Sequence, residues 1–226
     1  MFRAVLFDFD GVITDSEILH LRAFNSVLSS HGLEITKKDY YTAYLGLTDL
    51  DCFKTLIAEG RLNLDVSGID DLISQKSVIF EELVETEGSI IEGVRDFLAM
   101  LKHNSIIMAI CSGALMAEIE VILGQARLRS FFEVVVSAEQ VRRGKPDPEG
   151  FLLTLQKLNR QRQDAIEANE CIVIEDSHWG LEAANEAGIH TVGVTNSYDA
   201  EQLTMAEKIV SHLGELNIEN LRQLCS

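Results

Sequence analysis

The chain has 226 residues, of which 46% are hydrophobic and 24% charged, a composition typical of a globular protein with a sizeable core. Its formal net charge of −17 argues against nucleic acids and anionic membranes as partners, because both attract basic surfaces. No apolar run approaches the roughly 18 residues of a membrane span, and no signal peptide is recognisable. We therefore expect a cytoplasmic protein.

The cysteines predict free thiols. Cys52, Cys111, Cys171 and Cys225 are far apart, no Cys-x-x-Cys pair occurs, and two of the four lie in apolar runs typical of buried strands. This pattern favours small buried side chains in a reducing compartment over disulfides or a zinc site.

The N-terminal segment predicts a buried strand that ends in acidic residues. Residues 4–7 form a continuous apolar run, typical of a strand buried on both faces. Asp8 and Asp10 follow at once, and Gly11 allows a sharp backbone turn. Ligands of open parallel sheets bind beyond the carboxyl ends of strands, where these carboxylates lie. Two adjacent carboxylates repel unless a cation lies between them, and oxygen ligands favour Mg²⁺.

The next segment predicts helices. Ser16 is a plausible N-cap for a helix whose apolar residues recur at helical spacing, namely Ile18, Leu21, Phe24 and Leu28. Helical patterns separated by glycines continue to about residue 88, without convincing β alternation. We predict an all-helical insert over residues 16–88, within a core formed by residues 1–15 and 89–226.

The remainder of the chain alternates between strand and helix patterns. Apolar runs predict four further strands, over residues 106–111, 132–136, 171–174 and 191–194. Such alternation predicts an α/β fold with a doubly wound parallel sheet, in which the strand over 171–174 can lie beside the first strand.

Polar residues follow three of these strands. Ser112 and Gly113 offer a hydroxyl and backbone N–H groups to a phosphate oxygen. Lys145, in a loop stiffened by two prolines, can offset charge on a transferring phosphoryl group. Glu175 and Asp176 end a buried strand, where acidic groups are costly unless a cation or hydrogen-bond donors receive them.

Together these segments resemble the haloacid dehalogenase superfamily, and most closely its branch of β-phosphoglucomutases, sugar phosphatases and phosphoglycolate phosphatases. The matching runs are Phe-Asp-Phe-Asp-Gly-Val-Ile-Thr-Asp-Ser, the Ser of the second strand end, Gly-Lys-Pro-x-Pro-x-x-Phe and Val-Ile-Glu-Asp-Ser-x-x-Gly. The resemblance implies that Asp8 is a nucleophile forming an aspartyl-phosphate and that Asp10 is the general acid and base. It also implies phosphate binding by Ser112, Gly113 and Lys145.

The resemblance further implies a Mg²⁺ cofactor and a helical cap. The ligands of Mg²⁺ would be the carboxylates of Asp8 and Asp176, the backbone carbonyl of Asp10, and Glu175 directly or through water. Residues 16–88 would form the cap, with Glu17, His20 and Lys76 as possible substrate contacts. For His20 a surface or core histidine is the alternative, and for Lys76 an ordinary solvated lysine is favoured.

We therefore expect a Mg²⁺-dependent phosphatase, a monomer or weak homodimer, that hydrolyses a small phosphate ester such as a sugar phosphate or phosphoglycolate. A β-phosphoglucomutase, a haloacid dehalogenase and a receiver-type module that accepts phosphate without turnover are the alternatives. Dehalogenases need no metal, so the acidic pair Glu175-Asp176 argues against the dehalogenase alternative. Receiver modules are about half as long and lack a helical insert. Family mutases carry an Arg in a cap loop of the form Gly-x-Ser-Arg, where this chain has Gly-Leu-Thr-Asp at residues 46–49.

Overall fold

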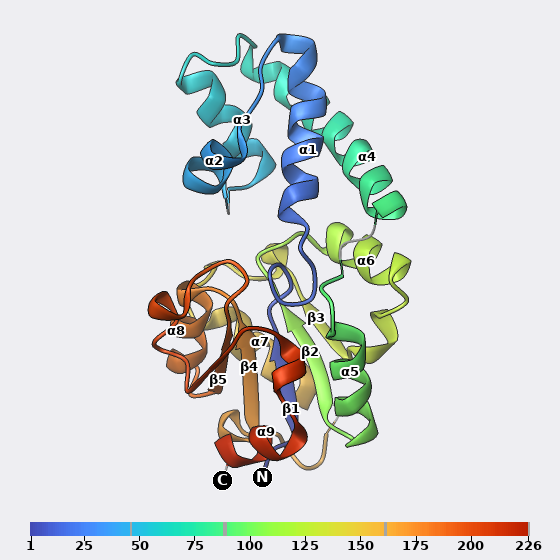
Figure 1. Cartoon of the computed structure of the whole chain (residues 1–226), viewed down its shortest axis with the longest axis vertical. Coiled ribbons are helices and arrows are strands. Elements are labelled where there is room, and N and C mark those ends of the chain that lie inside the picture. Colours follow the sequence, from blue (N-terminus) through green and yellow to red (C-terminus); the bar gives the residue numbers. More distant parts are fainter. Residues whose placement is uncertain (46, 88–89, 161, 226) are drawn as a thin grey trace. The chain divides into compact units, whose positions relative to one another are not determined.

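The structure, a computed structural model, describes residues 1–45, 47–87, 90–160 and 162–225. The chain forms two compact units (Figure 1). The sheet unit comprises Met1–Asp15 and Ile90–Ser226, and the helical unit comprises Ser16–Ser89. Gly46, and residues 88 and 89, where we expect the helical insert to end, lie outside the described residues.

Within the described residues, the sheet unit contains a six-stranded parallel sheet in the order β3-β2-β1-β4-β5-β6. The strands are β1 (Ala4–Phe7), β2 (Ile107–Cys111), β3 (Val134–Val136), β4 (Cys171–Glu175), β5 (His190–Val194) and β6 (Lys208–Val210). The predicted α/β fold is confirmed. Strand β4 pairs with β1, with Phe7 opposite Ile174, so the carboxyl ends of these two strands are adjacent, as the sequence allows.

Two elements differ from the sequence prediction. Strand β6 was not predicted, because it has only three residues and its first is a lysine. Residues 182–187, before Gly188, have a helical pattern, but the helix there begins earlier, at His178. Its N-cap is Ser177, whose side chain accepts a hydrogen bond from the backbone N–H of Gly180 at 3.1 Å.

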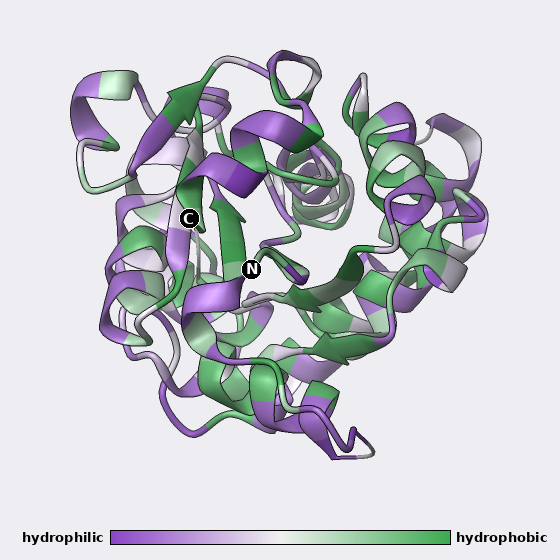
Figure 2. Ribbon diagram, turned by 90° about the horizontal axis from the view of Figure 1, so that it is seen from below, coloured by the Kyte–Doolittle hydropathy of each residue, from purple (hydrophilic) through white to green (hydrophobic). Residues whose placement is uncertain are grey.

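Helices cover both faces of the sheet. They are α5 (Val94–His103), α6 (Met116–Gln125), α7 (Glu149–Asn159), α8 (His178–Glu186) and α9 (Ile218–Leu224). Helices α7 and α8 pack on one face, in a core that joins Leu6 and Val173 of the sheet to Phe151 and Ala184. On the other face, the ring of Phe7 meets that of Phe97 from α5 at 6.1 Å, edge to face. Hydrophobic colouring follows the central strands in Figure 2.

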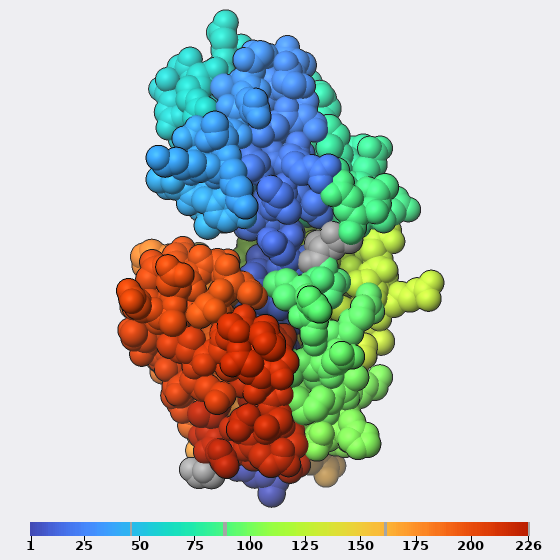
Figure 3. All heavy atoms as spheres, viewed as in Figure 1, coloured from blue at the N-terminus to red at the C-terminus, as the bar shows by residue number. Residues whose placement is uncertain are grey.

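The C-terminal segment closes the α5 side of the sheet. A short 3-10 turn, Leu213–Glu215, contacts α5, and Leu213 and Leu221 of this segment are buried. Figure 3 shows these C-terminal residues, in red, beside the green residues of the segment that contains α5.

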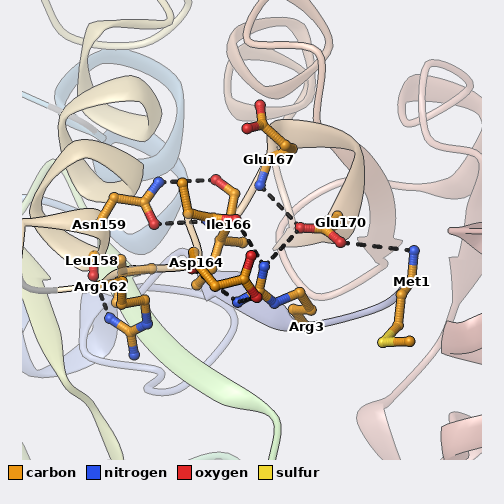
Figure 4. A network of polar contacts seen from close by, with 10 residues as sticks. Met1, Arg3, Leu158, Asn159, Arg162, Asp164, Ile166, Glu167 and Glu170 are labelled. Atoms are coloured by element: carbon orange, nitrogen blue, oxygen red, sulfur yellow. Dashed lines mark hydrogen bonds and ion pairs between the residues drawn. The ribbon is translucent and has the colours of Figure 1, made fainter.

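A polar network fixes the opposite, amino-terminal end of β1 (Figure 4). The Arg3 guanidinium donates to the backbone carbonyls of Asp164 and Ala165 at 3.1 and 2.8 Å. It also pairs with the carboxylate of Glu170 at 3.1 Å, while the backbone N–H of Arg3 donates to the Glu170 carbonyl at 2.8 Å. These contacts hold the loop before β4 against the start of β1 and support the pairing of the two strands that carry the acidic residues.

Within residues 16–45 and 47–87, the helical unit has only helices as regular elements. They are α1 (Glu17–Leu28), α2 (Lys37–Asp39), a π-turn (Tyr40–Tyr44), α3 (Asp49–Ala58) and α4 (Ile69–Glu87), with 3-10 turns at Ser29–His31 and Val66–Gly68. Apolar residues from α1, α3 and α4, among them Phe24, Phe53 and Leu72, form its own core. No helix in the described part of the chain is long and apolar enough to cross a membrane.

Candidate active site

Four predicted site residues meet at the carboxyl edge of the sheet. Asp8 follows β1, Glu175 ends β4, Asp176 follows it, and Lys145 lies in the loop between β3 and α7. The Lys145 ammonium contacts Oδ1 of Asp8 and donates to Oε1 of Glu175 at 2.6 Å. Parallel pairing of β1 with β4 brings the acidic residues together, and the loop between β3 and α7 supplies the Lys145 ammonium.

Three carboxylates form a buried cluster. Asp8, Glu175 and Asp176 are 7%, 1% and 4% exposed, and each offers an oxygen within 4.8 Å of the others. Burial, opposed by the Lys145 ammonium and reinforced by Glu175, raises the pKa of Asp8 to about 7. Burial and repulsion by Glu175 and Asp8 raise the pKa of Asp176 to about 8. An oxygen-only cluster that is difficult to ionise fits a hard divalent cation, which would remove this repulsion.

The Lys145 side chain is held as a cation. Burial lowers its pKa, but Asp8 and Glu175 raise the pKa by more, so that it lies above its usual range. The ammonium also lies 5.3 Å from the centre of the Phe151 ring, the last residue of the Gly-Lys-Pro-x-Pro-x-x-Phe run. The Lys145–Pro146 peptide bond is cis.

Both oxygens of Glu175 already accept hydrogen bonds. Oε1 accepts from Lys145, and Oε2 accepts from the backbone N–H and the hydroxyl of Ser177 at 2.7 and 2.9 Å. The space for this side chain exists because residue 180 is glycine, since a Cβ there would lie 1.7 Å from Oε1 of Glu175. Glu175 therefore links the lysine to the start of α8.

Gly11 makes room for Asp176, another candidate metal ligand. Its φ is +77°, in the left-handed region that glycine adopts readily, and its N–H donates to the carbonyl of Thr14 at 2.7 Å. A Cβ at Gly11 would lie 1.7 Å from Oδ2 of Asp176. The turn after β1 can therefore approach the end of β4 only with glycine at this position.

The remaining core candidates lie in the turns after β1 and β2. The hydroxyl oxygen of Ser112 accepts from the N–H of Ala114 at 2.9 Å, and Ser112 is 6% exposed. Gly113 is exposed, and a Cβ there would meet only open space. Asp10 is partly buried, and its backbone pairs with Thr14 in an isolated bridge.

Two residues at this edge were missed by the sequence analysis. The side-chain amide of Asn196 donates to the carbonyl of Gly11 at 2.6 Å, and the hydroxyl of Ser197 hydrogen-bonds to Asp176. Both lie just beyond Thr195, which follows β5. Like Asp8 and Ser112, they are polar residues that come soon after a buried strand.

The candidates from the helical unit form pairs within that unit. The Glu17 carboxylate accepts from the Tyr40 hydroxyl at 2.8 Å. The Lys76 ammonium donates to Oδ1 of Asp49 at 2.8 Å and lies 2.7 Å from Nδ1 of His20. Because an ammonium only donates, this His20 nitrogen is the acceptor and Nε2 carries the proton.

The expectation of a solvated Lys76 is wrong. Its side chain is fully buried, and its ammonium lies 4.9 Å from the Phe24 ring and 5.2 Å from the Phe80 ring. The His20 ring stacks on Phe80 at 4.1 Å, and its pKa lies well below the usual value because of burial and the nearby ammonium. The lysine is stabilised inside the unit by a carboxylate, an imidazole and two aromatic rings.

The cysteines also follow the prediction. All four are free, and Cys52, Cys111 and Cys171 are buried. Burial raises the pKa of the Cys111 thiol to about 11. These thiols are neutral, packed side chains.

Comparisons with known proteins identify the family of this chain. A family model described as haloacid dehalogenase-like hydrolase matches residues 5–194. A phosphorylated carbohydrates phosphatase of Thermotoga maritima is 32% identical over 225 residues, covering 95% of this chain and 99% of that protein. A fructose-1-phosphate phosphatase of Escherichia coli is 27% identical, with 85% of this chain and 96% of that protein covered.

This chain is also similar to a solved structure over its whole length. The crystal structure of β-phosphoglucomutase from Clostridium difficile superposes with a TM-score of 0.80 at 25% identity, covering 100% of this chain and 97% of that one. The family model spans most of the chain, including all four strand ends that carry the candidate site. The chain belongs to the haloacid dehalogenase-like hydrolases.

Proposed function

We propose that this hydrolase is a Mg²⁺-dependent phosphatase that acts on small phosphate monoesters, such as sugar phosphates or phosphoglycolate. The observation that carries the proposal is the buried set of Asp8, Lys145, Glu175 and Asp176 at one edge of the sheet. Relatives named as phosphatases of phosphorylated carbohydrates and of fructose 1-phosphate support the substrate class.

The reaction we propose has two steps. A carboxylate oxygen of Asp8 attacks phosphorus and the bond to the leaving oxygen breaks, while Asp10 gives that oxygen a proton. Asp10 then takes a proton from water, which attacks phosphorus and releases phosphate from Asp8. Lys145 and Ser112 stabilise charge on the phosphoryl oxygens, with the backbone N–H groups near Gly113.

The metal ligands in this proposal are Asp8, the backbone carbonyl of Asp10, and Asp176. Glu175 has donors on both oxygens, which favours a role in holding Lys145 and contacting the metal through water. When bound, Mg²⁺ supplies positive charge that offsets the charge on the transferring phosphoryl group.

A mutase is the second candidate, favoured by the likeness to β-phosphoglucomutase. A mutase must hold a bisphosphate, and the cap residue that is Arg in family mutases corresponds to Asp49 here. Lys54 and Lys76 are the lysines that could supply the missing positive charge, and of these the Lys76 ammonium is paired with Asp49 at 2.8 Å. Since this pair leaves no net positive charge for a second phosphate, we favour a phosphatase that uses the helical unit to select monophosphates.

The test is a phosphate-release screen over sugar phosphates, phosphoglycolate and nucleotides, with Mg²⁺. Release by the wild type that disappears in EDTA and in Asp8→Ala is expected. Full activity in EDTA, or substantial turnover by Asp8→Ala, would contradict the proposal. For the mutase, β-glucose 1-phosphate is supplied with a trace of the 1,6-bisphosphate. Glucose 6-phosphate that accumulates faster than free phosphate would establish the mutase instead.

A further inference from the structure

The loop that follows β5 reaches across β4 to the acidic cluster. Val194 ends β5, and three residues later the Ser197 hydroxyl lies beside the Asp176 carboxylate, both next to Gly11, where its hydrogen bond lowers the pKa of Asp176. Asp176 is 4% exposed, whereas Asn196 and Ser197 are exposed. Hydrogen-bond donors favour the ionised form of a buried carboxylate, and here a donor comes from a solvent-facing loop.

Three segments meet at one point beside this hydrogen bond. A Cβ placed on Gly11 would lie 1.7 Å from Oδ2 of Asp176 and 2.9 Å from the hydroxyl oxygen of Ser197. The turn after β1, the end of β4 and the loop after β5 are therefore in direct contact there.

Asn196 fixes this loop to the turn. Its side-chain amide donates to the carbonyl of Gly11 at 2.6 Å, and the Asn196 backbone N–H donates to the carbonyl of Val194 at 2.9 Å. The backbone N–H of Thr195 is held by the carbonyl of Val210 in β6 at 3.0 Å. Ser197 is thus presented to Asp176 by a loop anchored at both the turn and the sheet.

We infer that Ser197, held in place by Asn196, is a positioning residue that orients Asp176 for the divalent cation. The inference rests on the proposed function, which makes Asp176 a metal ligand. A carboxylate ligand has rotational freedom about its terminal bond, and a hydrogen bond to one oxygen directs the other toward the metal. Partners of this kind typically change metal affinity by about 10–100-fold when removed.

The experiment is calorimetric titration of the metal-free protein with Mg²⁺ in the absence of substrate. The variants are Ser197→Ala, Ser197→Thr, which keeps the hydroxyl, and Asn196→Ala. Ser211→Ala is the matched control, because Ser211 is also an exposed serine whose hydroxyl donates to a carboxylate, that of Glu215, away from the cluster. Thermal unfolding of each metal-free protein is measured alongside.

We expect Ser197→Ala to raise the Mg²⁺ dissociation constant about 10–100-fold. Asn196→Ala should raise it at least about threefold, since the hydroxyl is then less firmly placed, while Ser197→Thr and Ser211→Ala stay within about threefold of wild type. The unfolding midpoints of the metal-free variants should remain close to that of the wild type. If Ser197 had a purely structural role, its replacement would lower the midpoint and leave the Mg²⁺ affinity of the folded protein unchanged. Unchanged affinity in Ser197→Ala, beside wild type that binds Mg²⁺, would overturn this inference alone. Absence of Mg²⁺ binding by the wild type would overturn the proposed metal site, and this inference with it.

Discussion

Gly180 and Glu175 fit together so closely that a Cβ on residue 180 would lie 1.7 Å from Oε1 of the glutamate. That oxygen accepts the hydrogen bond from Lys145, so the absence of a side chain at residue 180 supports the position of the lysine.

We predict that Gly180→Ala displaces Glu175 and weakens its hold on Lys145. Phosphate release should fall at least about tenfold, and the free energy of unfolding by about 1–3 kcal/mol, as for other overpacked sites. Gly124→Ala is the control, because Gly124 also lies in a helix but a Cβ there meets nothing within 4 Å. That change should leave activity unaltered and stabilise the protein by up to about 1 kcal/mol. Equal kinetics in the two variants would contradict the prediction.

Lys145→Ala should reduce kcat for phosphate release by about 10²–10³-fold, the cost of removing one group that stabilises developing charge. The circular dichroism spectrum should not change. Arg143→Ala is the control from the same loop, because Arg143 is 72% exposed and pairs with Asp147. It should retain activity within about twofold, since an exposed ion pair contributes little. Wild-type kinetics in Lys145→Ala would show that this lysine is only a loop charge.

Asp10→Asn should lower turnover of an alkyl phosphate by about 10²–10⁴-fold, the usual contribution of general acid–base catalysis. An activated aryl phosphate should be less affected in the first step, because its leaving group needs less protonation. Rates for both substrates are compared in the variant and the wild type. A loss below about tenfold on the alkyl phosphate would remove Asp10 from this role.

The buried Lys76–Asp49 pair gives a prediction on stability. Asp49→Asn should lower the free energy of unfolding by about 1–3 kcal/mol, below the 3–5 kcal/mol typical of fully buried pairs, because the Asp49 side chain is 20% exposed. Adding Lys76→Met should recover part of the loss, since the uncompensated charge is then gone. Urea unfolding measures both. A double variant less stable than Asp49→Asn alone would show that Lys76 stabilises the unit mainly through its other contacts.

His20 predicts a loss of stability toward acid pH. Burial and the Lys76 ammonium lower the pKa of His20 well below 6.5, so the unfolded chain binds its proton first as pH falls. Its contribution to stability is therefore complete above pH 6.5 and is lost progressively below it. The variant His20→Gln should show a weaker decline between pH 7 and 5 in urea unfolding. Exposed His31 is the control, and an identical decline in His20→Gln and His31→Gln would contradict the assignment.

The sequence predicted those site residues that lie next to a buried strand in the chain. Asp8, Glu175 and Asp176 directly follow or end a buried run, and parallel strands place such positions at one edge of the sheet, while Lys145 lies in the loop beyond β3. Their convergence could therefore be predicted without coordinates. Strand β6 could not, because three residues carry too little periodicity.

Burial of individual side chains was less predictable. Lys76 lies on a 19-residue helix, and its burial depends on Asp49, 27 residues earlier, and on rings from two helices. Such a contact leaves no local pattern. The hydrogen bonds to both oxygens of Glu175 likewise depend on three-dimensional geometry. Gly180, which makes room for the Glu175 side chain, is nevertheless visible in the sequence motif.

The antiparallel bridge between Thr14 and Ile90 has a consequence for how this chain can diversify. The N–H of Ile91 donates to the carbonyl of Ile13 at 3.1 Å, so the sheet unit joins its two segments by its own backbone, whatever sequence lies between them. Replacing that intervening sequence changes only the length of a loop whose ends are already fixed, and each doubling of length costs about 0.6 kcal/mol. The acidic cluster lies within the sheet unit, so we expect a change in length of the segment between Asp15 and Ile90 to leave Asp8, Glu175 and Asp176 together.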